Sequence, residues 1–256
     1  MCTVTWLFEE SGYQLFCNRD EKFTRRPALP PRMEVRNQVR YISPEDGDHG
    51  GSWIATNEFG ITLCLLNGPP SSLHAPRRSR GLLILDLIPF SSIRDVREQV
   101  EGTSLYSYSP FTLTALEPGE PALLVHWDRS EKTIAMHAER HFMLTSSSFD
   151  SGRVVAHRRE SYASLKEPVT IDQLRAFHES HGDGPSAYSV CMHRPDAETV
   201  SFSHIRVSPA ETDFFYSPTA LCKLSMATTL KLTRRMSVLP IPPTRAADHW
   251  GTVSLK

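Results

Sequence analysis

The chain carries the segment TVTWLFEESGYQLFCNRDE at residues 3–21, and this segment points to a β-hairpin. Residues 3–8 and 13–16 are short runs rich in β-branched and aromatic side chains, and Ser11-Gly12 supplies a turn between them. The polar run that follows Phe16 then stands at the exit of the second strand. Because the two strands of a hairpin face one another, a turn near residues 10–12 brings residue 2 beside residues 18–20.

The rest of the sequence alternates between strand-like and helix-like segments. Residues 25–48, rich in Pro, Arg and Asp, suggest a long irregular excursion. Alternation and turn residues predict strands at 52–56, 60–66, 111–117, 122–128, 132–137, 141–145, 188–192, 200–207 and 213–216. Spacing and capping residues predict helices at 80–87, 91–100, 152–164 and 170–180. This order favours an α+β fold of two antiparallel sheets with helices outside them, as one domain over residues 1–230 and a proline-rich arm at 231–256.

Composition excludes several functional classes. The charged set makes up 22% of the 256 residues, and 28 basic side chains balance 29 acidic ones, so nothing attracts the chain to nucleic acid. The longest apolar stretch, residues 81–90, is interrupted by Asp86 and is shorter than the roughly 20 residues that cross a bilayer. We expect no membrane span. The start of the chain lacks the pattern of a secretory signal, so we expect a cytoplasmic location.

Common cofactor and metal signatures are absent from the sequence. There is no phosphate-binding or dinucleotide-binding glycine pattern, and the 5 cysteines include no C-x-x-C pair. His137 and His141 enclose a glutamate that is one place too late for a zinc helix, which favours ordinary surface or core histidines. His178 and His181 lie on a predicted helix without an obvious third ligand, which favours solvated side chains. The expectation is no metal.

Cys2 is the main candidate for a catalytic residue. Methionine aminopeptidases act when the second side chain is small, so removal of Met1 would leave Cys2 with both a thiol and a free α-amine. An amine of pKa about 7.7–8.0 can take the proton of a thiol of pKa about 8.5 at neutral pH. Arg19 would favour the thiolate, and Asp20 would hold the amine. The alternative is that Cys2 is an apolar strand residue, with Arg19 and Asp20 as surface charges after the strand.

Three segments together resemble a known family: Met1-Cys2-Thr3, the run LFCNRDE at residues 15–21, and GSWIATNEFG at 51–60 continuing to Asn67. They are similar to the NRDE family, also called the transport and Golgi organisation family, most clearly over about the first 90 residues. That family resembles the N-terminal-nucleophile hydrolases, whose fold is a four-layer αββα sandwich. More distantly, the opening resembles bile-salt hydrolases and penicillin V acylases, which cleave non-peptide amide bonds through an acyl-cysteine.

The resemblance implies a catalytic set in this chain. Cys2 would be the nucleophile, Arg19 the cation that supports the thiolate, and Asp20 the partner of the α-amine. Asn67 matches the oxyanion-hole asparagine of the cysteine branch, although a turn residue before Gly-Pro is an equal alternative. The substrate would be a small acyl amide, and the route needs no cofactor.

The resemblance also implies substrate-binding positions. Asn18 belongs to the motif, and Ser146 stands in a segment where the acylases place a second active-site asparagine. Here that segment offers only serines, which weakens the hydrolase interpretation. Arg153 aligns loosely with a further active-site arginine, and an exposed helical arginine is an equal alternative.

Two other functions remain open from the sequence. Members of the NRDE family are associated with haem trafficking and lipid homeostasis, so a non-catalytic haem or lipid-handling protein is the main alternative. An inactive hydrolase fold kept as an interaction module is the third possibility. The oligomeric state does not follow from the sequence.

Overall fold

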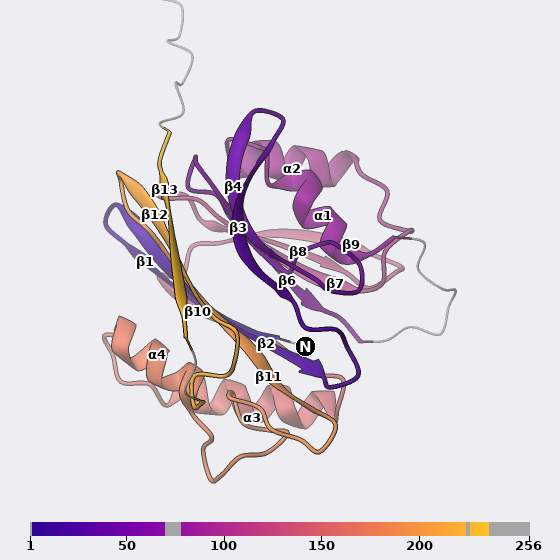
Figure 1. Cartoon of the computed structure of the whole chain (residues 1–256), viewed down its shortest axis with the longest axis vertical. Coiled ribbons are helices and arrows are strands. Elements are labelled where there is room, and N and C mark those ends of the chain that lie inside the picture. The colour runs from indigo at the N-terminus through magenta and orange to yellow at the C-terminus, as the bar shows by residue number, and fades with distance from the viewer. Residues whose placement is uncertain (1, 70–77, 224–225, 236–256) are drawn as a thin grey trace, which may run out of the picture.

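Two antiparallel sheets lie face to face, and helices cover the outer face of each sheet (Figure 1). The computed structural model describes residues 2–69, 78–223 and 226–235. Within these residues the layers follow the order helices, sheet, sheet, helices. The predicted four-layer αββα sandwich is therefore confirmed.

The first sheet contains the N-terminal hairpin at its centre. Its six strands follow the order β10-β1-β2-β11-β12-β13. Their bounds are β1 (Cys2–Glu9), β2 (Gly12–Lys22), β10 (His141–Ser146), β11 (Ala197–Val207), β12 (Glu211–Ser217) and β13 (Thr228–Thr233). Helices α3 (Ser151–Ala163) and α4 (Ile171–Glu179) cover its outer face. Thr170 begins α4 with a capping box that it forms with Gln173.

The second sheet has seven strands in sequence order, from β3 to β9. Their bounds are β3 (Leu29–Arg36), β4 (Val39–Glu45), β5 (Ile54–Asn57), β6 (Thr62–Asn67), β7 (Phe111–Leu116), β8 (Ala122–Trp127) and β9 (Lys132–His137). Helices α1 (Arg80–Leu87) and α2 (Ile93–Gly102) pack on its outer face. The Ser92 side chain accepts a hydrogen bond from the Asp95 backbone N–H and so caps α2.

Strand alternation sorts the side chains of β1 between two environments. Cys2, Val4 and Trp6 point into the core between the sheets. Leu7, on the opposite face, packs under α4 against Leu174. Since successive residues of a strand point to opposite faces, Arg19 on β2 shares the inner face and Asp20 shares the outer one.

The proline-rich stretch at residues 25–48 is not irregular, as the sequence suggested. It forms the β3–β4 hairpin, whose turn is made by Asn37 and Gln38 with φ of 49° and 64°. Pro30 and Pro31 fit because β3 is an edge strand and its register with β4 shifts between Leu29 and Arg32, so neither proline is a paired position of the ladder.

Three other predictions also need correction. The strand at 141–145 follows the one at 132–137 closely in the chain, so pairing between them is the simple expectation, but β10 joins the other sheet beside β1. Residues 188–192 form bends instead of the expected strand. The ordered part of the domain extends past 230, because β13 runs to Thr233 and the Arg235 backbone N–H donates to the Glu58 carbonyl. Residues 236–256, the rest of the expected arm, lie outside the described residues.

No helix in the described parts of the chain is long and apolar enough to cross a membrane.

His178 is fully buried, although the sequence favoured a solvated side chain. Its ring lies among those of Phe16, Phe177 and Phe202. Within the described parts of the chain, only its Nε2 has a hydrogen-bond partner, the hydroxyl of Thr5. Burial lowers the pKa of His178 from 6.5 to about 3. Burial likewise lowers the pKa of His204, on β11, to about 4.

These two histidines predict that the fold loses stability in mild acid. The unfolded chain protonates both below about pH 6.5, whereas the folded chain keeps them neutral, so each removes up to about 1.4 kcal/mol of unfolding free energy per pH unit below 6.5. Urea unfolding at pH 7.5 and pH 5 should show this loss, and His204→Gln should reduce it. The exposed His126→Gln is the control and should match wild type. An unchanged pH dependence in His204→Gln would contradict the assignment.

Candidate active site

Cys2 begins β1 at the wall of a cavity between the sheets. Its register partners are Arg19 on β2 and Ser146 on β10, so it is flanked on both sides within its sheet. The cavity has a volume of about 340 Å³. Cys2, Arg19, Trp53 and Asn67 line it together with residues from the start of α1. The side chain of Cys2 is buried, with 4% of its surface exposed.

Arg19 is held in place by opposite charge and by an aromatic face. Its Nη2 donates to Asp46 Oδ2 at 2.7 Å, and the same nitrogen lies 3.6 Å from Glu21 Oε2. The guanidinium carbon lies 4.3 Å from the centroid of the Trp53 ring. Asp46 also binds Arg25, at 2.7 Å. The charge of Arg19 is therefore largely compensated before any substrate enters.

The thiol of Cys2 is not activated in the described state. A hydrogen bond with Cys17, on the same face of β2, and burial raise the pKa of Cys2 well above its usual value. This direction is opposite to the one expected from the presence of Arg19. The pKa is raised because the sulfur lies in apolar surroundings, which disfavour the thiolate, and because the guanidinium of Arg19 is paired with Asp46. A base is therefore needed to take the thiol proton.

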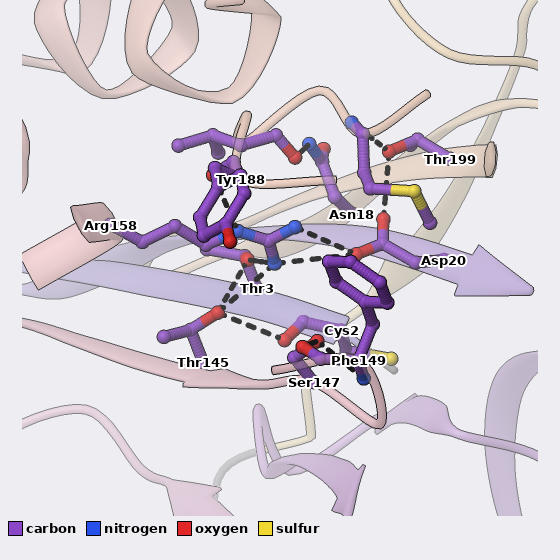
Figure 2. Close-up of polar contacts among 12 residues, drawn as sticks. Cys2, Thr3, Asn18, Asp20, Thr145, Ser147, Phe149, Arg158, Tyr188 and Thr199 are labelled. Atoms are coloured by element: carbon purple, nitrogen blue, oxygen red, sulfur yellow. Dashed lines mark hydrogen bonds and ion pairs between the residues drawn. The ribbon is translucent and has the colours of Figure 1, made fainter. Parts of the chain in front are cut away.

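Asp20 lies on the outer face of β2, fully buried under α3 (Figure 2). Its Oδ2 is 3.3 Å from Nη1 and Nη2 of Arg158, and its Oδ1 accepts a hydrogen bond from Thr199 Oγ1 at 2.7 Å. Arg158 Nη1 also donates to the hydroxyls of Thr3 and Thr145. Position 20 follows the register partner of Cys2 on β2, so Asp20 lies one residue beyond Cys2 at the open end of the hairpin.

Asn67 and Ser146 approach Cys2 from two different strands. Asn67 ends β6 in the facing sheet and lines the same cavity. Ser146 ends β10 directly opposite Cys2, on the same face of the sheet. Among the described residues, its buried Oγ has no hydrogen-bond partner. Asn67 therefore shares the cavity with Cys2, and Ser146 is the neighbour of Cys2 across the strand pair.

Two predicted positions lie away from the cavity. Asn18 is buried on the outer face, where its Nδ2 donates to the carbonyls of His178 and Val190. Arg153 has 80% of its side chain exposed and contacts Asp150 and Tyr188 on the surface of α3. Neither of them contacts the Cys2 cavity in this arrangement.

The sequence missed Arg158 and Trp53. Arg158 lies five residues after Arg153 on the same helix, and its side chain is 1% exposed. Arginine is rarely buried without a charged partner, but the sequence does not say which of the arginines of α3 faces the sheet. Trp53 stood in the motif that carries the family resemblance, yet a tryptophan beside a strand more often signals core packing.

The four-layer sandwich, with Cys2 at the start of its first strand, is the fold of the N-terminal-nucleophile hydrolases. Three solved structures are similar to it. The C2A mutant of conjugated bile acid hydrolase from Clostridium perfringens has a TM-score of 0.56 and 13% identity, and covers 90% of this chain and 92% of its own. Penicillin V acylase from Agrobacterium tumefaciens gives 0.53 and 10%, with 90% and 86% covered. The Caenorhabditis elegans ortholog of N-acylethanolamine-hydrolyzing acid amidase gives 0.55 and 10%, with 80% and 92% covered.

The sequence itself identifies the family. The family model described as Transport and Golgi organisation 2 matches residues 1–181, more than two thirds of the chain. The chain belongs to this family, as the NRDE motif predicted. No curated protein sequence matches it.

Proposed function

We propose that the protein is an amide hydrolase that cleaves the C–N bond of a small N-acyl amide through an acyl group carried on Cys2. The observation that carries the proposal is the position of Cys2, at the end of a strand, on a cavity that Arg19 and Asn67 also line. The three similar solved structures are a conjugated bile acid hydrolase, a penicillin V acylase and an ortholog of an N-acylethanolamine-hydrolyzing acid amidase. At 10–13% identity, this similarity supports only the fold, and the residues above support the chemistry.

The proposed reaction uses the α-amine that removal of Met1 would expose on Cys2. This amine takes the thiol proton, and the sulfur lone pair forms a C–S bond with the amide carbonyl carbon. The oxygen then carries the negative charge, stabilised by the Asn67 amide and a backbone N–H. Collapse of this tetrahedral intermediate breaks the C–N bond, and the leaving amine takes the proton from the ammonium. Water adds to the thioester, the C–S bond breaks, and the acid and the Cys2 thiol are released.

The raised thiol pKa is compatible with this sequence of steps. A thiol that stays protonated at rest reacts only when a base removes its proton, and the α-amine would stand on the same residue. Asp20 is buried at the end of the hairpin toward which the amine would point, and Arg158 holds the carboxylate there. Asp20 would therefore orient the amine, and Arg158 would position Asp20.

The charges of the cavity favour a substrate with an anionic group. Arg78 and Arg80 line it beside Arg19 and Arg25, against the carboxylates of Glu21 and Asp46. Arg78 pairs with Asp86 at 2.6 Å, whereas Arg80 donates to the Pro110 carbonyl and forms no ion pair with a carboxylate of the described residues. A carboxylate, sulfonate or phosphate on the amine portion of the substrate would satisfy this cation.

The test is a panel of N-acyl amides with neutral and anionic amine portions. We expect release of the amine, faster for the anionic members, and a mass increase equal to the acyl group on the peptide that begins with Cys2. Intact mass should also show loss of Met1. A retained Met1 with full turnover, or an acyl group on another cysteine, would refute the proposed mechanism.

Asn67 gives a second, smaller prediction. Loss of one oxyanion donor in other enzymes costs about 2.7–4 kcal/mol, so Asn67→Ala should lower kcat by about 10²–10³-fold with little change in KM. Asn67→Asp keeps the size of the side chain but removes the donor, and should show a similar loss. Steady-state kinetics measure both. A change confined to KM would assign Asn67 to substrate binding instead.

A further inference from the structure

Four potential metal ligands meet on the outer side of the first sheet, away from the Cys2 cavity. His181, Cys191 and His193 belong to the connection between α4 and β11, and Cys222 follows β12. One ligand atom from each lies within 4.8 Å of all the others. The two sulfurs are 3.4 Å apart, and His193 Nε2 lies 3.6 Å from the Cys191 sulfur and 3.4 Å from that of Cys222.

These separations fit a tetrahedral zinc ion. With Zn–S bonds of about 2.3 Å and Zn–N bonds of about 2.0–2.1 Å, two ligand atoms on a tetrahedron lie roughly 3.3–3.8 Å apart. The separations of the two sulfurs from each other and from His193 Nε2 fall within this range. A disulfide would instead need the sulfurs at about 2.05 Å. Two thiolates and two imidazoles are the ligand set that zinc prefers.

The two histidines are oriented as metal ligands. His181 Nε2 is buried, and among the described residues it has no hydrogen-bond partner. Its ring centroid lies 5.1 Å from that of His193. His193 turns Nε2 to the sulfurs and Nδ1 to Glu198 Oε2, 3.6 Å away. Carboxylates commonly hold the second nitrogen of a zinc-bound histidine in this way, which fixes the ring and its tautomer.

We propose that His181, Cys191, His193 and Cys222 bind one zinc ion. Both thiols lose their protons to solvent on binding, so the two thiolates neutralise the charge of Zn²⁺. Four protein ligands leave no open position for substrate, which makes the site structural. The exposed Cys222 gives the ion a route from solvent.

The site would clamp the connection that supports the hairpin motif. Next to Cys191, the Val190 carbonyl accepts a hydrogen bond from Asn18. On its other side, the Met192 N–H donates to Thr199 Oγ1, and Thr199 donates to Asp20. Zinc would therefore tie the Cys222 segment to the loop that holds Asn18 and Asp20 on β2. The inference does not depend on the proposed hydrolysis.

The direct test is the zinc content of untagged protein. After incubation with Zn²⁺ and a phosphine reductant, followed by gel filtration, elemental analysis should find about one zinc per chain. Cys222→Ser and His181→Ala should lose most of it, while the matched controls Cys64→Ala and His126→Ala should keep it. Co²⁺ in place of zinc should give the visible absorption of a tetrahedral, thiolate-bound ion in wild type and not in Cys222→Ser.

Chelation gives a second readout that does not involve catalysis. Removing zinc with EDTA should lower the Tm of wild type by on the order of 5 °C or more, and should leave that of Cys222→Ser unchanged. Cys222 is exposed, so its serine variant is expected to fold, and circular dichroism checks this. The proposal is overturned if wild type binds no zinc, if both ligand variants bind as much as wild type, or if protein prepared with zinc loses the mass of two hydrogens through a Cys191–Cys222 disulfide.

Discussion

Replacing Cys2 with alanine is expected to lower the turnover of the best N-acyl amide by at least about 10³-fold. The substitution removes the sulfur, which is the only protein atom that bonds the acyl group in the proposed mechanism. In other enzymes, loss of the nucleophile lowers kcat by as much as about 10⁶-fold. The loss should appear in kcat, because the walls of the cavity still bind the substrate. Measurement of the released amine over hours gives the sensitivity that such a slow variant needs.

Cys64→Ala is the matched control for this experiment. Cys64 is also a buried thiol between the sheets, 3.8 Å from Cys17, but it does not line the cavity. Its variant should keep turnover within a few-fold of wild type and form the same acyl adduct on Cys2. Turnover that survives in Cys2→Ala, at a level similar to that of Cys64→Ala, would refute the role of Cys2.

Replacing Arg158 with alanine should destabilise the fold by about 3–5 kcal/mol. Both members of its ion pair with Asp20 are 1% exposed, so the substitution leaves a buried carboxylate without its cation, and the hydroxyls of Thr3 and Thr145 each lose a donor. Urea unfolding at pH 7.5 measures the change. Because Asp20 would lose one of the groups that position it, the kcat for N-acyl amides should fall as well.

Arg153→Ala provides the comparison on the same helix. Arg153 is 80% exposed and lies 3.5 Å from Asp150, so its loss should change the free energy of unfolding by no more than about 1 kcal/mol. The double variant Asp20→Asn, Arg158→Met removes both charges and should recover part of the stability lost in Arg158→Ala. If Arg153→Ala and Arg158→Ala lower the free energy of unfolding equally, the buried ion pair does not stabilise the fold more than the exposed one.

Local patterns predicted those parts of the fold in which each segment carries its own signal. The first hairpin alternates cleanly, and the capping threonine of α4 stands at the expected place. The sequence does not reveal the β3–β4 hairpin because proline ordinarily signals a loop, whereas an edge strand tolerates it. Nor does it reveal the place of β10 beside β1, because this pairing depends on contacts between residues more than 130 positions apart.

The candidate site was also predictable only in part. The sequence pointed to Cys2, Arg19 and Asn67 as candidate catalytic residues, and all three line one cavity. Strand alternation sends Asp20 to the opposite face from Arg19, so the two side chains cannot both face the thiol of Cys2. Arg158 and the cluster around Cys191 depend on which side of a helix or loop faces the sheet, and such packing is not readable from spacing.

The pairing of β1 with β10 also sets an order of events during synthesis. Residues 141–146 complete the sheet beside Cys2, and they leave the ribosome more than 130 residues after it. At about 5–20 residues per second, the N-terminus stays accessible for on the order of ten seconds before its second neighbour arrives. Removal of Met1 within this interval would expose the Cys2 amine before Ser146 arrives beside it.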